Sequence, residues 1–224
     1  MREIVLDTET TGLEPESGHR ICEIAALELL NHVPTGRLFH RYVNPERPMP
    51  PEALAIHGLT EEFLAQHPRF EVIAEELLLF VANDRLVIHN AGFDIAFINA
   101  ELARIGRAAM IIEFEDTLAL ARKRYPGAPA SLDALCRRFA VDNSVRDKHG
   151  ARRDCELLAA VYLELIGGRQ PGLDLTASIL TEGHGAILER PARPPRAFPP
   201  SAAELALHRA FLGKLKAPLW LVAG

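Results

Sequence analysis

Residues 3–9 read Glu-Ile-Val-Leu-Asp-Thr-Glu, and this stretch decides the fold and the chemistry that we expect. The apolar run Ile4-Val5-Leu6 is typical of a strand that is buried on both faces. Asp7 and Glu9 follow, and because side chains alternate along a strand, both carboxylates should lie on the same side. A divalent cation, which prefers oxygen ligands, would stabilise both in the ionised form. The alternative is that the strand has already ended and both acids face water.

The remainder of the first 168 residues continues with strand and helix patterns. Three strands, followed by strands that alternate with helices, indicate an α/β domain with one mixed sheet and helices on its faces. Residues 44–51 form a polar, proline-containing loop in this pattern. The expected strands are 3–7, 20–31, 36–43, 86–88 and 111–114, and the expected helices are 61–66, 70–81, 91–105, 117–124, 132–139 and 151–166.

The chain changes character after Gly168. Residues 1–168 hold 18 Lys and Arg against 26 Asp and Glu, a net charge of −8, whereas residues 169–224 hold 7 against 4, a net charge of +3. Five prolines within residues 188–200 exclude a helix or a central strand there. We therefore expect a domain at 1–168, a flexible proline-rich linker at 169–200, and a short apolar segment at 201–224 that packs against another protein.

Composition limits the class of protein. The 224 residues are 48% hydrophobic and 25% charged, which is typical of soluble globular proteins. We expect a cytoplasmic protein, because no apolar run reaches the roughly 18 residues of a membrane span and no signal peptide is recognisable. Cys22, Cys136 and Cys155 are widely spaced and should be buried free thiols. The net charge of −5 argues against a protein that grips a nucleic-acid backbone.

Two further aspartates lie at expected helix starts. Asp94 and Asp154 each fall in a first turn, where the helix dipole stabilises a carboxylate. Asp154 also shares a helix face with Leu158 and Val161, which aims it toward the core. Either residue alone could be an ordinary first-turn acid. Together with the two acids of the first strand, they predict a cation site.

A histidine precedes the last of these acids. His149 lies five residues before Asp154, in the loop Lys148-His149-Gly150. A loop histidine is usually solvated. Beside a group of carboxylates, however, an imidazole with an ordinary pKa of about 6.5 is the side chain best suited to accept a proton from water.

Three motifs resemble those of the DnaQ-like DEDDh 3′–5′ exonucleases. They are Asp-Thr-Glu-Thr-Thr-Gly at 7–12, His-Asn-Ala-Gly-Phe-Asp at 89–94 and His-Gly-Ala-Arg-Arg-Asp at 149–154, and their order and separations match the family. Within the family, the chain is most similar to the proofreading members that belong to bacterial DNA polymerase III. One departure is Arg152-Arg153, where relatives commonly carry apolar or small residues, which alters the positive charge near the site.

The resemblance implies an RNase H-like fold, with a mixed five-stranded sheet flanked by helices, and a two-metal hydrolysis. Two divalent cations, Mg²⁺ or Mn²⁺, would help to release nucleoside 5′-monophosphates from mismatched DNA 3′ ends. Their charge of +4 would balance four carboxylates, so the net charge of the chain is a poor guide because it counts the ligands without their ions. By resemblance, Asp7 bridges the ions, Glu9 and Asp154 bind the ion that activates water, Asp94 helps to hold the other, and His149 is the general base.

The resemblance also implies a pocket for the terminal nucleotide. The backbone of a turn can approach the sugar closely, and a phenylalanine ring can stack on any frayed base. Because a mispaired end frays more readily, a site that accepts single-stranded ends would remove errors selectively. Without the resemblance, Phe93 reads equally well as core and Asn90 as a helix cap. The expected substrate-binding residues are Thr10, Thr11, Gly12, His57, Asn90 and Phe93.

Two protein partners are implied by the C-terminal part. The peptide 170–175, Gln-Pro-Gly-Leu-Asp-Leu, resembles the segments that dock on the bacterial sliding clamp beta, although such hexapeptides also occur by chance. The apolar end of the chain is expected to bind the alpha subunit of DNA polymerase III. No membrane partner is expected. The expected contacts are Gln170, Leu173 and Leu175 for the clamp, and Phe211, Leu215 and Trp220 for the polymerase.

Two other functions remain open. One is a stand-alone DEDDh exonuclease that acts on RNA or short oligonucleotides, against which the proline-rich tether and the terminal aromatic residue argue. The other is a noncatalytic subunit that stabilises a polymerase, against which the presence of all five catalytic positions argues.

Overall fold

The computed structural model of the chain describes residues 1–144, 148–168 and 199–215. Residues up to 168 carry the sheet and its helices, and residues 199–215 carry one further helix, α8 (Ala202–Leu212). Most of the expected linker and the peptide 170–175 lie outside the described residues. No helix in the described ranges combines the length and the apolar character that a membrane span requires.

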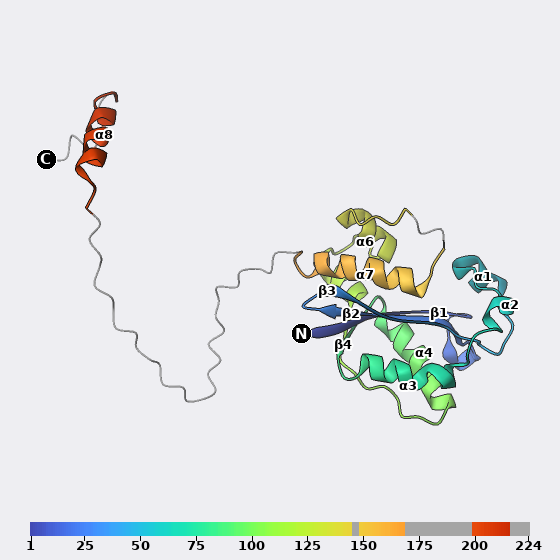
Figure 1. Ribbon diagram of the computed structural model, residues 1–224. Helices are drawn as coiled ribbons and strands as arrows, with labels where there is room; N and C mark the ends of the chain where they lie inside the picture. The colour runs from blue at the N-terminus through green and yellow to red at the C-terminus, as the bar shows by residue number, and fades with distance from the viewer. Residues whose placement is uncertain (145–147, 169–198, 216–224) are drawn as a thin grey trace, which may run out of the picture. The chain divides into compact units, whose positions relative to one another are not determined.

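The sheet has five strands in the order β3-β2-β1-β4-β5 (Figure 1). The pairs β1–β2 and β2–β3 are antiparallel, whereas β1–β4 and β4–β5 are parallel, so the expected mixed sheet is confirmed. The strands are β1 (Arg2–Thr10), β2 (Ile21–Leu30), β3 (Val33–Tyr42), β4 (Arg85–Ile88) and β5 (Phe114–Asp116). The helices of this part are η1 (Pro15–Ser17), α1 (Pro51–His57), α2 (Glu61–Leu64), α3 (Phe70–Val81), α4 (Ala91–Arg104), α5 (Thr117–Arg124), α6 (Leu132–Phe139) and α7 (Ala151–Leu165).

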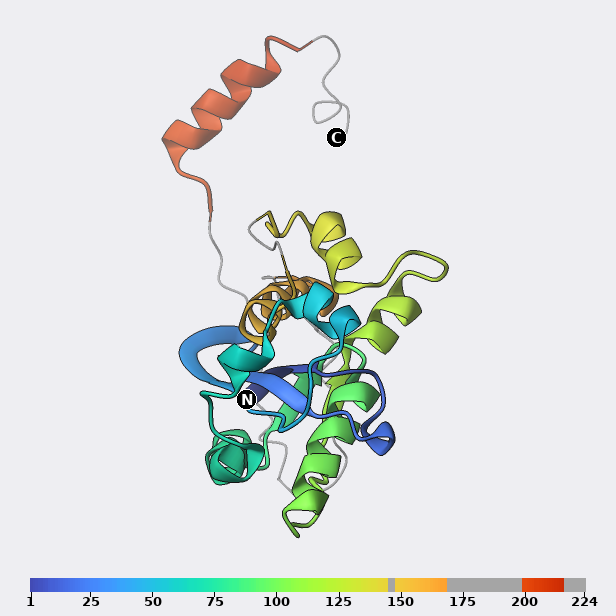
Figure 2. The same cartoon turned by 90° about the vertical axis from the view of Figure 1, so that its right-hand side faces the viewer.

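Helices cover both faces of the sheet. Figures 1 and 2 show α6 and α7 on one face and α3 and α4 on the other. Two buried clusters correspond to these faces, because Ile4 and Leu6 pack with α3 and α4, whereas Val5 packs with α6 and α7. The three cysteines are buried and free, as expected. Strand β1 is therefore the element from which side chains reach both helix layers.

The structure differs from the expected elements in several places. Strand β1 runs to Thr10 instead of residue 7, and β3 begins at Val33 instead of residue 36. The last strand begins at Phe114 instead of residue 111, because pairing with β4 starts at Leu86 opposite Phe114 and leaves Ile111 97% exposed. Helix α1 was not expected; it begins at Pro51, where the expected loop ends, and continues to His57. Its signals are Pro51 in the first turn and Gly58 as a left-handed C-cap at φ 75°.

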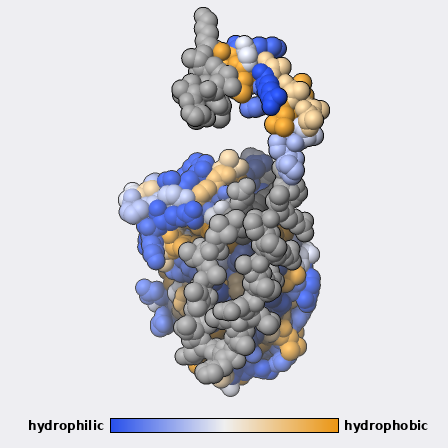
Figure 3. Space-filling view, turned by 90° about the vertical axis from the view of Figure 1, so that its left-hand side faces the viewer, coloured by the Kyte–Doolittle hydropathy of each residue, from blue (hydrophilic) through white to orange (hydrophobic). Residues whose placement is uncertain are grey.

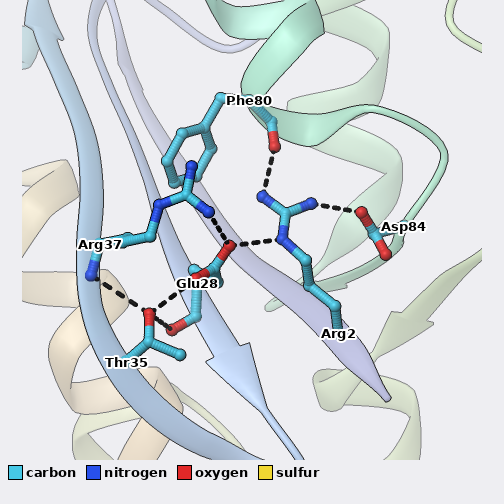
Figure 4. A network of polar contacts seen from close by, with 6 residues as sticks. All are labelled: Arg2, Glu28, Thr35, Arg37, Phe80 and Asp84. Atoms are coloured by element: carbon cyan, nitrogen blue, oxygen red, sulfur yellow. Dashed lines mark hydrogen bonds and ion pairs between the residues drawn. The ribbon is translucent and has the colours of Figure 1, made fainter.

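A network of ion pairs and hydrogen bonds surrounds Arg2, at the N-terminal end of β1 (Figure 4). The buried Glu28 carboxylate lies 2.5 Å from Arg2 Nε and 2.8 Å from Arg37 Nη1. Arg2 also pairs with Asp84 and donates to the Phe80 carbonyl oxygen at 2.7 Å. These contacts tie β1 and β2 to the end of α3, at the opposite end of β1 from Asp7 and Glu9.

Candidate active site

Strand β1 presents its two acids on the face of the sheet that α7 covers. Val5 packs on that face, and because side chains alternate, Asp7 and Glu9 continue the same side. The strand runs past both acids, so the alternative in which it ends before them is wrong. Glu9 is buried and Asp7 is partly buried, which places a pair of carboxylates at the edge of the core.

Asp94 approaches the same place from helix α4, in the layer on the opposite face. Its side chain is buried, and the Thr8 hydroxyl donates a 2.7 Å hydrogen bond to Asp94 Oδ1. Burial raises the pKa of Asp94 to about 7, although the hydrogen bond from Thr8 opposes the shift. Since Thr8 lies between the two acids of β1, a single strand presents two carboxylates and orients a third.

Asp154 and His149 come from the start of α7. Asp154 is buried in the first turn, whereas His149 precedes the helix and its side chain is 50% exposed. His149 Nδ1 lies 3.3 Å from Asp154 Oδ2. One ligand atom from each of Glu9, His149 and Asp154 lies within 4.8 Å of the other two. The fold therefore brings the first and third motifs together at one point.

Asp7 lies where the charges of the other three acids converge. Burial raises the pKa of Asp7 well above its usual range, and the negative charges of Asp94, Glu9 and Asp154 raise it further. Among the described residues, no arginine or lysine forms an ion pair with Asp7 or Asp94. A divalent cation would favour the ionised form of these carboxylates, whose oxygens are the ligands that Mg²⁺ and Mn²⁺ prefer. The donor set fits such an ion.

A fifth carboxylate, that of the buried Glu23, lies beside these four and was not expected from the sequence. Glu23 lies on β2 directly opposite Glu9, and its Oε1 is 2.7 Å from His40 Nε2 on β3. Its negative charge contributes to the raised pKa of Asp7. The sequence signal was an acid at position 23 inside the apolar run of residues 21–30, but only the register of β2 against β1 places it beside the site.

All six expected substrate-binding residues line one cleft of about 750 Å³, which Glu9 and His149 also line. The turn after β1 forms one wall of this cleft, and the residues around the start of α4 form another. Figure 2 shows these segments from the side of α1 and α2, with the strands nearly end-on. The six residues are Thr10, Thr11, Gly12, His57, Asn90 and Phe93.

Asn90 and Phe93 belong to the start of helix α4 and also line the cleft. Asn90 is the N-cap residue of α4, as its interpretation as a helix cap predicts, but its backbone is left-handed at φ 69° and its side chain makes no capping bond. Its backbone N–H donates instead to Asp116 Oδ1 at 3.1 Å. The Phe93 ring packs 4.9 Å from the Phe97 ring and also lines the cleft, so Phe93 is both partly buried core and cleft wall.

His57 lies in helix α1, in a segment where no helix was expected. It is the last residue of that helix, it is 5% exposed, and its Nδ1 accepts a 3.0 Å hydrogen bond from the Leu59 N–H. Burial lowers the pKa of His57, which favours the neutral ring at neutral pH. His57 can therefore offer a hydrogen bond to a ligand in the cleft without adding a positive charge.

The two arginines that depart from the family pattern pair with an acid one turn further along α7. Arg152 Nε lies 3.3 Å from Glu156 Oε1, and Arg153 Nη1 lies 3.1 Å from Glu156 Oε2. Arg153 also donates to the Asp142 carbonyl oxygen at 3.2 Å. Part of the positive charge that they add is therefore neutralised locally.

The expected partner contacts lie in the C-terminal part. Gln170, Leu173, Leu175 and Trp220 fall outside the described residues. Helix α8 is capped by Ser201 and Glu204 in a reciprocal capping box, and its Phe211 is 57% exposed. Leu215, just after the helix, is 38% exposed. Figure 3 shows hydrophobic residues on the surface of this helix beside hydrophilic ones.

Comparisons with known proteins identify the family of the chain. An exonuclease family model matches residues 4–162. DNA polymerase III subunit epsilon from Rickettsia conorii is 47% identical over 222 residues, with 96% of both chains covered. The subunit of the same name from Escherichia coli K12 is 45% identical over 176 residues, which cover 75% of this chain and 72% of that protein.

A solved structure shows the same fold. Exonuclease X in complex with 5′ overhanging duplex DNA is similar with a TM-score of 0.59 and 28% sequence identity, over 73% of this chain and 90% of that chain. The fold, the convergence of the motif residues and these similarities lead to one conclusion. The chain belongs to the DnaQ-like exonuclease family, in the branch of the DNA polymerase III epsilon subunits.

Proposed function

We propose that this protein is the proofreading 3′–5′ exonuclease of a bacterial DNA polymerase III, which removes mismatched 3′-terminal nucleotides from DNA. The observation that carries the proposal is the convergence of the acids of all three motifs and His149 beside a cleft of nucleotide size. The similarity to epsilon subunits, over 96% of both chains for the Rickettsia conorii protein, supports the same substrate and assembly.

Four carboxylates would hold the metal. Asp7, Glu9, Asp94 and Asp154 supply a charge of −4 when ionised, which two Mg²⁺ or Mn²⁺ ions would balance. When bound, such ions lower the pKa of a water and stabilise the charge that develops on the phosphate and the leaving oxygen. Asp7 is the candidate for the shared ligand, since its pKa responds to the charges of the other three acids.

His149 is the proposed general base. Its ring is half exposed at the mouth of the site, and its Nδ1 lies 3.3 Å from Asp154 Oδ2. A neighbouring carboxylate stabilises the imidazolium that forms when the ring accepts a proton. The position beside Glu9 and Asp154 allows the ring to accept that proton from a water held at the same carboxylates.

The cleft would hold the terminal nucleotide without selecting its base. The turn Thr10–Gly12 supplies backbone close to the sugar, and Phe93 supplies an aromatic surface for any base. Selection of errors then arises from the lower cost of fraying a mismatched end. If the isolated protein degraded matched and mismatched duplex ends at equal rates, the selection would have to come from the polymerase.

The C-terminal part would keep the nuclease at the primer end. Exposed apolar residues of α8, with Trp220 beyond it, form the proposed contact with the alpha subunit, and the peptide 170–175 forms the proposed contact with the sliding clamp. Deletion from residue 169 should preserve nuclease activity and abolish co-purification with the polymerase. Replacement of Gln170 and Leu173 by alanine should weaken clamp binding, and unchanged clamp affinity would disprove that contact.

The central experiment is digestion of a 5′-labelled single-stranded DNA with Mg²⁺, by the unaltered protein and by Asp154→Ala. We expect stepwise shortening from the 3′ end by the unaltered protein and none by the variant. Glu76→Gln, which alters an exposed acid on α3 that does not line the cleft, is the matched control and should digest normally. An unaltered protein without activity would favour the noncatalytic role, and equal digestion of RNA would favour the stand-alone enzyme.

A further inference from the structure

Gly12, the last residue of the first motif, lies against the ring of His19. Its backbone is not in the left-handed region, so backbone conformation does not require a glycine here. A Cβ at this position, however, would lie 2.3 Å from both Nδ1 and Cε1 of His19. No side chain fits at that distance while the ring stays in place. Glycine at position 12 therefore makes room for the ring of His19.

The orientation of the His19 ring is set by Thr11. The Thr11 side chain is fully buried, its oxygen accepts a 3.0 Å hydrogen bond from the Arg20 N–H, and it lies 3.2 Å from His19 Nδ1. A buried hydroxyl proton needs an acceptor, and Nδ1 of a neutral ring provides it. In that arrangement Nδ1 is the acceptor, and the ring carries its own proton on Nε2 as a hydrogen-bond donor.

His19 also lines the cleft, together with the turn Thr10–Gly12, Asn90 and Phe93. It is partly exposed there, and it was not among the residues expected from the sequence. We propose that His19 is a further substrate-contacting residue, whose Nε2–H donates a hydrogen bond to an acceptor on the terminal nucleotide. This inference rests on the proposed function of the cleft. A single donor that meets an acceptor common to all nucleotides, on the sugar or on the minor-groove edge of the base, would add affinity without base selection.

The test compares two substitutions of His19 in the full-length protein. His19→Phe keeps a flat ring against Gly12 but removes the donor, whereas His19→Gln keeps a donor. With Mn²⁺ present, we expect His19→Phe to raise the Kd for deoxythymidine 5′-monophosphate, measured by calorimetry, about tenfold. His19→Gln should recover most of that loss. The KM for single-stranded DNA should rise in parallel, with little change in kcat.

The control is His67→Phe, a histidine that packs on Tyr42 and Phe63 and does not line the cleft. It should leave the Kd unchanged. An unchanged Kd in His19→Phe, or equal losses in His19→Phe and His19→Gln, would overturn the proposal. The same measurement with 2-deoxyribose 5-phosphate locates the acceptor. If His19→Phe also binds this compound more weakly, the acceptor is on the sugar or the phosphate. If only binding of the nucleotide is weakened, the acceptor is on the base. Because the Kd is measured without turnover, failure of this inference is distinguishable from failure of the proposed nuclease activity.

A double substitution tests the role of Gly12. Gly12→Ala should weaken nucleotide binding in the unaltered background, because the new methyl group displaces the His19 ring. In the His19→Ala background, the same change should add less than about a twofold loss, since the obstacle is gone. A further large loss of nucleotide affinity in that background would contradict the inference that Gly12 is needed to make room for the His19 ring.

Discussion

Buried acids lie near both ends of strand β1, and their pKa values shift in opposite directions. At the N-terminal end, Glu28 lies between Arg2 and Arg37, and these partners lower the pKa of its carboxyl (Figure 4). At the other end, burial raises the pKa values of Asp7 and Asp94, and the negative charges of the neighbouring acids raise that of Asp7 further. Both groups of acids lie at the edge of the same core, so burial alone does not explain the difference.

The difference lies in the source of the neutralising charge. The network around Glu28 is complete within the chain, and it stabilises the fold. The acids of the site repel one another, which destabilises the metal-free fold and creates a strong preference for a divalent cation. A stability penalty of this kind is typical of catalytic sites. Substitutions at the two ends should therefore affect different properties.

The largest effect is expected for Asp7→Ala. Loss of the acid on which the other three charges converge should lower the rate of 3′-end hydrolysis by about 10³-fold or more. Thermal stability without metal should stay the same or rise, because the change removes a buried charge. Calorimetric unfolding and single-strand digestion measure the two properties. A variant that lost both activity and stability would show that Asp7 is a structural residue.

The next effect is the dependence of metal-free stability on pH. The folded pKa of Asp94, about 7, lies above its ordinary value near 4, so the stabilising contribution is present at low pH and is lost as pH rises through about 7. The unfolding temperature without metal should therefore fall as the pH rises from the ordinary pKa of an aspartate to about 7. Asp94→Asn should make this fall smaller. Saturating Mn²⁺ should raise the unfolding temperature at pH 8 much more than at pH 4. Equal effects of Mn²⁺ at both values would contradict a carboxylate site.

A moderate effect is expected at the N-terminal end. Glu28→Gln should reduce the free energy of unfolding by about 1–3 kcal/mol, because it leaves Arg2 and Arg37 without their shared carboxylate. Hydrolysis should be unchanged. Because the folded pKa of Glu28 is lowered, its contribution is present above its ordinary value and is lost as pH falls through the folded value. The difference between variant and unaltered protein in urea unfolding should consequently shrink in acid.

The smallest effect is expected for an exposed pair. Arg41 Nη2 lies 2.5 Å from Glu76 Oε1, but the two side chains are 40% and 54% exposed. Solvent screens such a pair, so Glu76→Gln should change the free energy of unfolding by no more than about 0.5 kcal/mol. A loss as large as that of Glu28→Gln would show that distance, and not burial, controls the strength of these ion pairs.

Most of the residues that form the proposed active site could be predicted from the sequence because they belong to short motifs with local signals. Alternation along β1 placed Asp7 and Glu9 on one side, and helix starts placed Asp94 and Asp154. Helix α1 was missed although Pro51 and Gly58 mark its ends, since the proline-rich approach resembles a loop. The last strand was displaced because apolar character at Ile111 indicates burial that sheet pairing does not supply.

The sequence by itself determined the class of fold, most of the order of strands and helices along the chain, and the four acids that are proposed to hold the metal. These features follow from local periodicity and from short motifs. Only the tertiary structure decided that Glu23 faces Glu9, that Thr8 holds Asp94, and that the His19 ring occupies the space left by Gly12. Such contacts depend on strand register and on side chains that meet through the fold or across a turn, and no local pattern encodes those distances.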